Sequence, residues 1–97
     1  MWIAEAVDTP VGYVGGHLTR RFKCDGEVQW LYVVANYRRT GVRSELLRLL
    51  MAWFRGREAR RICVDVGDED ARPFYQRHGA IDLNKHWMVW NDIQSAG

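Results

Sequence analysis

The fold is decided by one stretch, Leu31-Tyr-Val-Val-Ala-Asn-Tyr-Arg-Arg-Thr-Gly-Val-Arg-Ser44. Its apolar start predicts a strand, its centre predicts a tight loop with two adjacent arginines, and its end leads into an amphipathic helix. The first N–H groups of a helix have no partners within the helix and carry the positive end of its dipole. Such a strand–loop–helix junction is therefore a ready site for a phosphate or pyrophosphate group.

A second patterned stretch follows, Asp68-Glu-Asp-Ala-Arg-Pro-Phe-Tyr-Gln-Arg-His-Gly79. Together, the two stretches resemble the signatures of the GNAT superfamily of acetyl-CoA-dependent N-acetyltransferases. The first signature, (Arg/Gln)-x-x-Gly-x-(Gly/Ala), stands here as Arg38-Arg-Thr-Gly-Val-Arg43, with arginine in place of the final small residue. The second, Asn-x-x-Ala-x-x-hydrophobic-Tyr-x-x-x-Gly, is matched from Asp68 to Gly79, with aspartate in place of asparagine.

The resemblance covers roughly residues 2 to 91 and implies the family fold. That fold is α+β: a central, mostly antiparallel sheet with a parallel βαβ unit at its centre, and two helices. A usual family member begins with a strand and two helices that wall the acceptor site, whereas this chain enters a hairpin almost at once. We therefore expect a single GNAT-like domain over residues 1–97, N-terminally truncated relative to the family.

Residue periodicity predicts where the elements lie. Strands are expected over residues 2–6, 11–18, 27–34 and 61–66, with short strands over 80–83 and 87–91, and helices over 42–54 and 70–78. The strands 27–34 and 61–66 are joined by a helix and should be parallel neighbours. The adjacent Gly15 and Gly16 predict a bulge or a close backbone approach.

The same periodicity predicts which residues share a face in two of these elements. In strand 27–34, alternation predicts one face made of Val28, Trp30, Tyr32 and Val34. In helix 42–54, the 3.6-residue period predicts a core face made of Val42, Leu46, Leu49, Leu50 and Trp53.

The resemblance also implies a binding site for acetyl-CoA. The residues implied to contact it are Val33, Val34, Arg38, Arg39, Thr40, Gly41, Val42, Arg43, Ser44, Asp68 and Phe74. The N–H groups of the loop would hold the pyrophosphate, Ser44 would cap the helix or join them, and the amides of Val33 and Val34 would pair with the pantetheine arm like an added strand. Two alternatives stay open: a plain strand–helix turn with solvated arginines, and Asp68 as a helix N-cap.

Tyr75 and Glu27 are the catalytic candidates. The resemblance implies that Tyr75 donates a proton to the departing CoA thiolate, and a phenol suits that role because its O–H is a donor. Glu27 falls where some family members carry a glutamate that acts as general base. The alternatives are a core aromatic residue for Tyr75 and an exposed charge at a strand end for Glu27.

Composition narrows the class of protein and its partners. A net charge of +2 over 97 residues, with interleaved acids, argues against a nucleic-acid binder. No apolar run approaches the length of a membrane span, and the two cysteines and three histidines lack metal-ligand spacing. We therefore expect a cytoplasmic protein without a bound metal. Five tryptophans in so short a chain favour a homodimer.

Two functions stay open from the sequence. The first is an N-acetyltransferase that moves an acetyl group from acetyl-CoA to a primary amine, of a small molecule or a peptide, by direct attack in a ternary complex. The second is a non-catalytic, GNAT-derived domain that binds CoA or dimerises. The loop and Tyr75 together favour the first.

Overall fold

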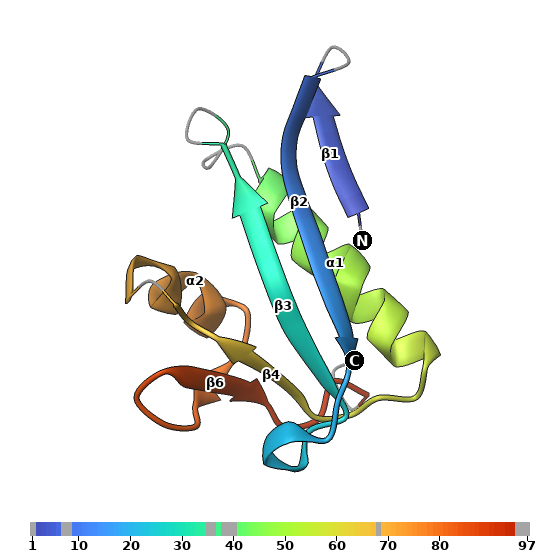
Figure 1. Cartoon of the computed structure of the whole chain (residues 1–97), viewed down its shortest axis with the longest axis vertical. Helices are drawn as coiled ribbons and strands as arrows, with labels where there is room; N and C mark the ends of the chain where they lie inside the picture. Colours follow the sequence, from blue (N-terminus) through green and yellow to red (C-terminus); the bar gives the residue numbers. More distant parts are fainter. Residues whose placement is uncertain (1, 7–8, 35–36, 38–40, 68, 95–97) are drawn as a thin grey trace.

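The computed structural model describes residues 2–6, 9–34, 37, 41–67 and 69–94. The elements, in chain order, are β1 (Trp2–Ala6), β2 (Thr9–Leu18), η1 (Arg21–Lys23), β3 (Gly26–Val33), α1 (Val42–Gly56), β4 (Ile62–Asp65), η3 (Glu69–Ala71), α2 (Arg72–Arg77), β5 (Ile81–Asp82) and β6 (Trp87–Trp90) (Figure 1). These bounds confirm the strands and helices expected from the sequence. Among the described residues, no helix is long and apolar enough to cross a membrane.

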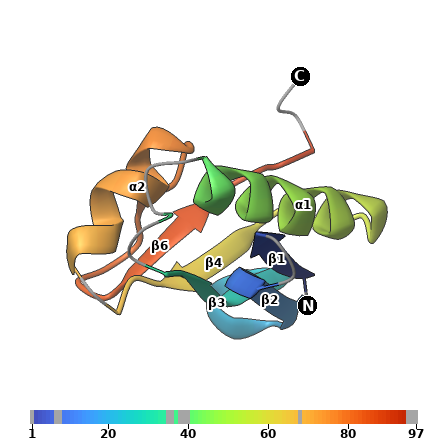
Figure 2. The same ribbon diagram turned by 90° about the horizontal axis from the view of Figure 1, so that it is seen from above.

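The six strands form one mixed sheet in the order β1-β2-β3-β4-β6-β5. The β3 and β4 strands run parallel, and every other neighbouring pair runs antiparallel. Helix α1 connects the two parallel strands, and both α1 and α2 lie on the same side of the sheet (Figure 2). The structure thus confirms an α+β fold with a parallel βαβ unit at the centre of a mostly antiparallel sheet.

Helix α1 covers the sheet with a face that differs from the predicted one. Its buried residues are Leu46, Leu47, Leu50, Met51 and Phe54. The predicted face was wrong in including Leu49 and in omitting Leu47, Met51 and Phe54, whereas Val42 and Trp53 are partly buried and pack against the core. The helix carries apolar residues around much of its circumference, so periodicity alone does not fix which stripe meets the sheet. Phe54 determines which face of α1 packs on the sheet, because its ring fills the space above Gly26.

A bulge in β3 overturns the predicted alternation of that strand. The register with β2 shifts between Gly15 and Gly16, which pair with Trp30 and Val28, so Gln29 is the extra residue. A bulge of this kind reverses which residues face each side of the sheet. Val28 is therefore buried whereas Trp30 is exposed, and the expectation that they share a face is wrong. The bulge that the two glycines predicted is confirmed.

The two cysteines lie in a small buried cluster with Val89. Both are free thiols, and burial is the main cause that raises the pKa of Cys63 to about 12. Because the thiolate is the nucleophile, and only a fraction of about 10⁻⁴ of Cys63 is in the thiolate form at pH 8, the residue should react slowly. We expect native protein to resist a thiol reagent at that pH and urea-unfolded protein to react at both cysteines. Rapid native labelling of Cys63 would mean that this cluster opens readily.

Candidate functional site

The parallel strands part soon after they begin. They pair only at Gly26 with Ile62, Glu27 with Cys63, and Val28 with Val64. Beyond Val28, β3 continues to Val33 with β2 alone on one side, while β4 diverges from it (Figure 1). The backbone of residues 29–33 thus presents an edge not paired with β4. Such an edge can take an extended ligand as an additional strand.

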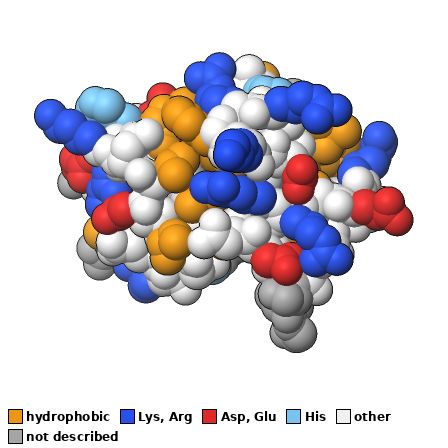
Figure 3. All heavy atoms as spheres, turned by 90° about the horizontal axis from the view of Figure 1, so that it is seen from below, with side chains coloured by type: hydrophobic (Ala, Val, Ile, Leu, Met, Phe, Trp, Pro, Cys, Tyr) orange, Lys and Arg blue, Asp and Glu red, His pale blue; other side chains and the backbone are white. Residues whose placement is uncertain are grey.

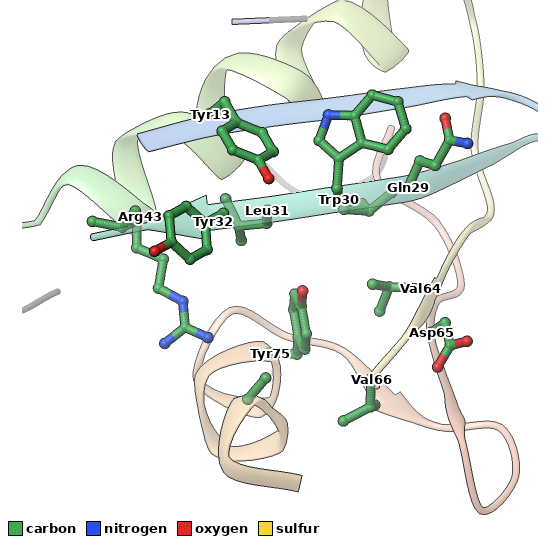
Figure 4. Close-up of a pocket in the computed structure, with 13 residues that line it drawn as sticks. Tyr13, Gln29, Trp30, Leu31, Tyr32, Arg43, Val64, Asp65, Val66 and Tyr75 are labelled. Carbon is green, nitrogen blue, oxygen red and sulfur yellow. The ribbon is translucent and has the colours of Figure 1, made fainter. Parts of the chain in front are cut away.

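A cavity of about 440 Å³, here called the cleft, opens where the strands part. The β2–β3 side supplies three aromatic residues, Tyr13, Trp30 and Tyr32. The opposite side comes from β4 and the residue after it, Val64, Asp65 and Val66. The helices add Arg43, Ala71 and Tyr75. Figure 4 shows Tyr75 projecting between the two sides, with its hydroxyl towards the β2–β3 side.

Tyr75 is held firmly by its neighbours. Its ring packs edge-on against Phe74 and Trp90, at centroid distances of 5.4 and 5.9 Å. Burial raises the pKa of the Tyr75 phenol, the positive charge of Arg43 opposes that shift, and the negative charge of Asp65 adds to it. The hydroxyl makes no hydrogen bond to any residue that the structure describes. A buried, protonated donor therefore faces the cleft.

The first turn of α1 reaches the cleft through Arg43, whereas Gly41 and Ser44 line a second cavity together with His78 and Gly79. Gly41 adopts φ +86, a left-handed conformation that favours glycine. The carbonyl of Gly41 accepts the first helical hydrogen bond from Glu45 N at 3.0 Å, and Gly41 provides no side-chain cap. Ser44 does not cap the helix, because its Oγ contacts His78 Nε2 at 3.0 Å. The loop residues Arg38, Arg39 and Thr40 lie outside the described residues.

Arg43, which replaces the small residue of the first signature, is half-buried in the second position of α1. Its guanidinium lies 4.2 Å from the centroid of the Phe74 ring. Figure 4 places the guanidinium beside Tyr32 and Tyr75 at one end of the cleft. No carboxylate among the described residues pairs with it. An unpaired cation at a helix N-terminus adds to the attraction for an anion.

Glu27 lies just before the point where the strands part. It is buried rather than exposed, and its Oε1 is 3.4 Å from Arg21 Nε and 3.9 Å from His17 Nε2. It does not line the cleft, whereas Asp65 does. Asp65 falls within the strand expected over residues 61–66 and belongs to neither sequence signature. Its place as the last residue of the strand parallel to β3 was the signal that could have singled it out.

The other expected cofactor residues have mixed surroundings. Val33 lines the cleft, and the carbonyl of Val34 accepts a hydrogen bond from Tyr37 N at 2.9 Å. Val42 packs against the core, and Phe74 is buried beneath Arg43. Asp68 lies outside the described residues. Among those residues, no group of three or more histidine, cysteine or acidic side chains could hold a metal ion.

Charge on the surface is mixed. On the face in Figure 3, lysine and arginine side chains are interspersed with acidic and apolar ones. The described ion pairs include Arg48 with Glu45 and Arg60 with Asp92. The described residues on this face therefore form no continuous basic stripe of the kind that tracks a nucleic-acid backbone.

The fold described above agrees with the family that the amino-acid sequence matches. The sequence model of the acetyltransferase (GNAT) family matches residues 1–80. The chain belongs to this family. No curated protein matches the chain.

Solved structures of acetyltransferases share the fold. A protein described as a GNAT-family acetyltransferase from Desulfovibrio desulfuricans aligns at a TM-score of 0.78 and 17% identity, over 94% of this chain and 67% of that one. An acetyltransferase from Thermus thermophilus aligns at 0.72 and 21%, over 84% and 56%. An aminoglycoside 6'-N-acetyltransferase complexed with coenzyme A aligns at 0.75 and 15%, over 94% and 71%. The chain thus spans 56% to 71% of the length of these three structures.

Proposed function

We propose that the protein is an acetyl-CoA-dependent N-acetyltransferase that transfers the acetyl group to a primary amine by direct attack in a ternary complex. The observation that carries this proposal is the parting of β3 from β4 at Val28, with the buried phenol of Tyr75 facing the cleft between them. Membership of the GNAT family supports it. Both the donor site and the acid for the leaving group then lie at one place in the fold.

The donor site follows from two sets of backbone groups. The edge of β3 over residues 29–32, which does not pair with β4, would pair with the amides of the pantetheine arm, and its N–H groups would polarise the thioester carbonyl. The first N–H groups of α1, together with the loop from Arg38 to Ser44, would hold the pyrophosphate. The unpaired guanidinium of Arg43 adds a charge-assisted donor at the same end.

Transfer then needs one acid and one base. The amine nitrogen attacks the thioester carbon, and Tyr75 gives its proton to the departing thiolate. Glu27 was the expected base, but it contacts Arg21 and does not line the cleft, so it would need a chain of water molecules to reach the amine. Asp65 lines the cleft and needs no such chain.

We also infer a cytoplasmic homodimer. Large apolar side chains outside the cleft are exposed, namely Leu18, Phe22 and Ile81. Exposed apolar surface on a small domain is commonly covered by a second copy. Sedimentation at micromolar concentration should give a dimer, and a monomer at all concentrations would contradict the inference.

Calorimetric titration with acetyl-CoA and CoA at low salt tests the proposed donor site. We expect micromolar binding that is lost in Gly41→Trp, because the new side chain would lie beside the first N–H groups of α1. Gly56→Trp is the matched control, since a Cβ at Gly56, at the other end of α1, has no heavy atom within 4 Å. No binding up to millimolar concentration would leave the non-catalytic dimerising domain as the function.

A further inference from the structure

We propose that the cleft selects a cationic amine with no carboxylate beside its nitrogen, and that Asp65 holds the ammonium and accepts its proton. This inference rests on the proposed acetyl transfer and names the class of acceptor: simple amines, diamines and lysine-type side chains rather than α-amino acids.

The first observation is an aromatic wall, defined as Tyr13, Trp30 and Tyr32. All three line the cleft and keep 40%, 42% and 44% of their surface exposed. The tyrosine rings lie 5.6 Å apart, and the Trp30 indole lies so close over Gly15 that a Cβ there would be 2.5 Å from Nε1. Exposed aromatic faces at a cleft attract organic cations through the ring quadrupole.

The second observation is the separation of charge along the cleft. Arg43 and Asp65 are the charged residues among those lining it, and Figure 4 shows them at opposite ends, with Tyr75 between them. Among the described residues, the Asp65 carboxylate accepts one hydrogen bond, from Gly67 N at 2.9 Å, and pairs with no cation. The Arg43 end suits the anionic donor, so the cationic acceptor meets Asp65.

The same charges disfavour a carboxylate on the acceptor. An α-carboxylate lies within a few ångströms of its amine and would face Asp65, where like charges repel. Arg43, the basic residue that lines the cleft, would be engaged by the anionic donor, and Arg21, 3.4 Å from Glu27, does not line the cleft. With Arg43 engaged by the donor, a zwitterionic amino acid would therefore lose the attraction and find no cationic partner for its acid group among the residues that line the cleft.

The proton balance is consistent with this placement. Asp65 accepts one proton from the ammonium, and the freed lone pair forms the N–C bond as the C–S bond of the thioester breaks. Tyr75 gives its proton to the thiolate and regains the second proton that the nitrogen loses. Asp65 passes its proton to solvent, so one ammonium and one thioester yield one amide, one thiol and one released proton.

The binding test needs no cofactor and no turnover. Choline and its neutral isostere 3,3-dimethylbutan-1-ol are titrated separately into the protein, with calorimetry as the readout. We expect choline to bind at least tenfold more tightly, and Asp65→Asn to remove that preference while keeping the acceptor oxygen for Gly67 N. Glu45→Gln, which removes an exposed carboxylate outside the cleft, should leave it unchanged.

Kinetics complete the test. Tyramine and tyrosine differ only in the α-carboxylate, and we expect kcat/KM to favour tyramine by at least 100-fold in wild type and far less in Asp65→Asn.

Equal binding of choline and its isostere, or a preference for tyrosine, overturns the inference. Choline binding without any CoA binding would keep the cation site and refute the acetyl transfer. If the aromatic wall is instead a contact between copies, choline does not bind and Trp30→Lys dissociates the dimer.

Discussion

Replacing Tyr75 with phenylalanine is expected to lower kcat for acetyl transfer by about 10²–10⁴-fold, the usual contribution of a positioned general acid. The substitution removes one hydroxyl, which makes no hydrogen bond to a described residue, and keeps the ring between Phe74 and Trp90. Stability and the Kd for CoA should therefore change little. Steady-state kinetics and calorimetry on the same preparation separate the two effects.

The pH dependence of activity provides a second test of the proposed role of Tyr75 as general acid. Burial raises the pKa of Tyr75 above its ordinary value of about 10, so the phenol is protonated at neutral pH. An acid that must be protonated loses activity as pH rises through its pKa, and the raised value places that loss above pH 10. The raised pKa also favours folding below pH 10, a contribution that is lost as pH rises through the folded-state value. Tyr75→Phe should abolish the alkaline loss of activity.

A matched control is available in the same cleft. Tyr32→Phe also removes one phenol oxygen, but from an exposed ring on the aromatic wall. We expect it to change kcat by less than about threefold, since it loses no proton transfer. If Tyr75→Phe behaved like Tyr32→Phe, Tyr75 would be a core aromatic residue and the leaving thiolate would be protonated by water.

The order of elements was predictable because each one carries a local signal. Alternation marked the strands, Gly41 marked the turn before α1, and Gly79, at φ +95, marked the end of α2. The buried faces of β3 and α1 were less predictable, because they depend on contacts between residues distant in sequence. The bulge at Gln29 needs β2 as its partner, and the core face of α1 is set by Phe54 meeting Gly26. Neither contact has a signature within its own segment.

The residues of the candidate site also differ in how far the sequence could predict them. Tyr75 and Gly41 belong to motifs, so the sequence indicated both of them. Asp65 belongs to no motif and becomes notable only because β3 and β4 part beside it. Glu27 was chosen by counting along the chain, and counting does not show that Arg21 lies 3.4 Å from its carboxylate. Local spacing therefore indicated residues at the Arg43–Tyr75 end of the cleft and did not indicate Asp65 at the other end.

Phe54→Ala is expected to cause the largest loss of stability, about 3–5 kcal/mol in the free energy of unfolding. Phe54 is fully buried and belongs to the main core between α1 and the sheet. Small domains have about 5–15 kcal/mol in total, so the variant should unfold at a much lower urea concentration. A loss below about 1 kcal/mol would mean that α1 repacks around the cavity.

Gly26 provides the test that the Phe54 contact itself fixes α1 on the sheet. A Cβ at Gly26 would lie 2.5 Å from Phe54 Cε1, so Gly26→Ala should cost about 1–3 kcal/mol by overpacking. Gly56→Ala meets only open space and is the neutral control. Combining Gly26→Ala with Phe54→Leu should cost less than the sum of the two single variants, because the smaller side chain vacates the space that the new methyl needs. Additive losses in urea unfolding would show that the two residues do not compete for one site, and the position of α1 would then depend on Leu46 and Leu50 instead.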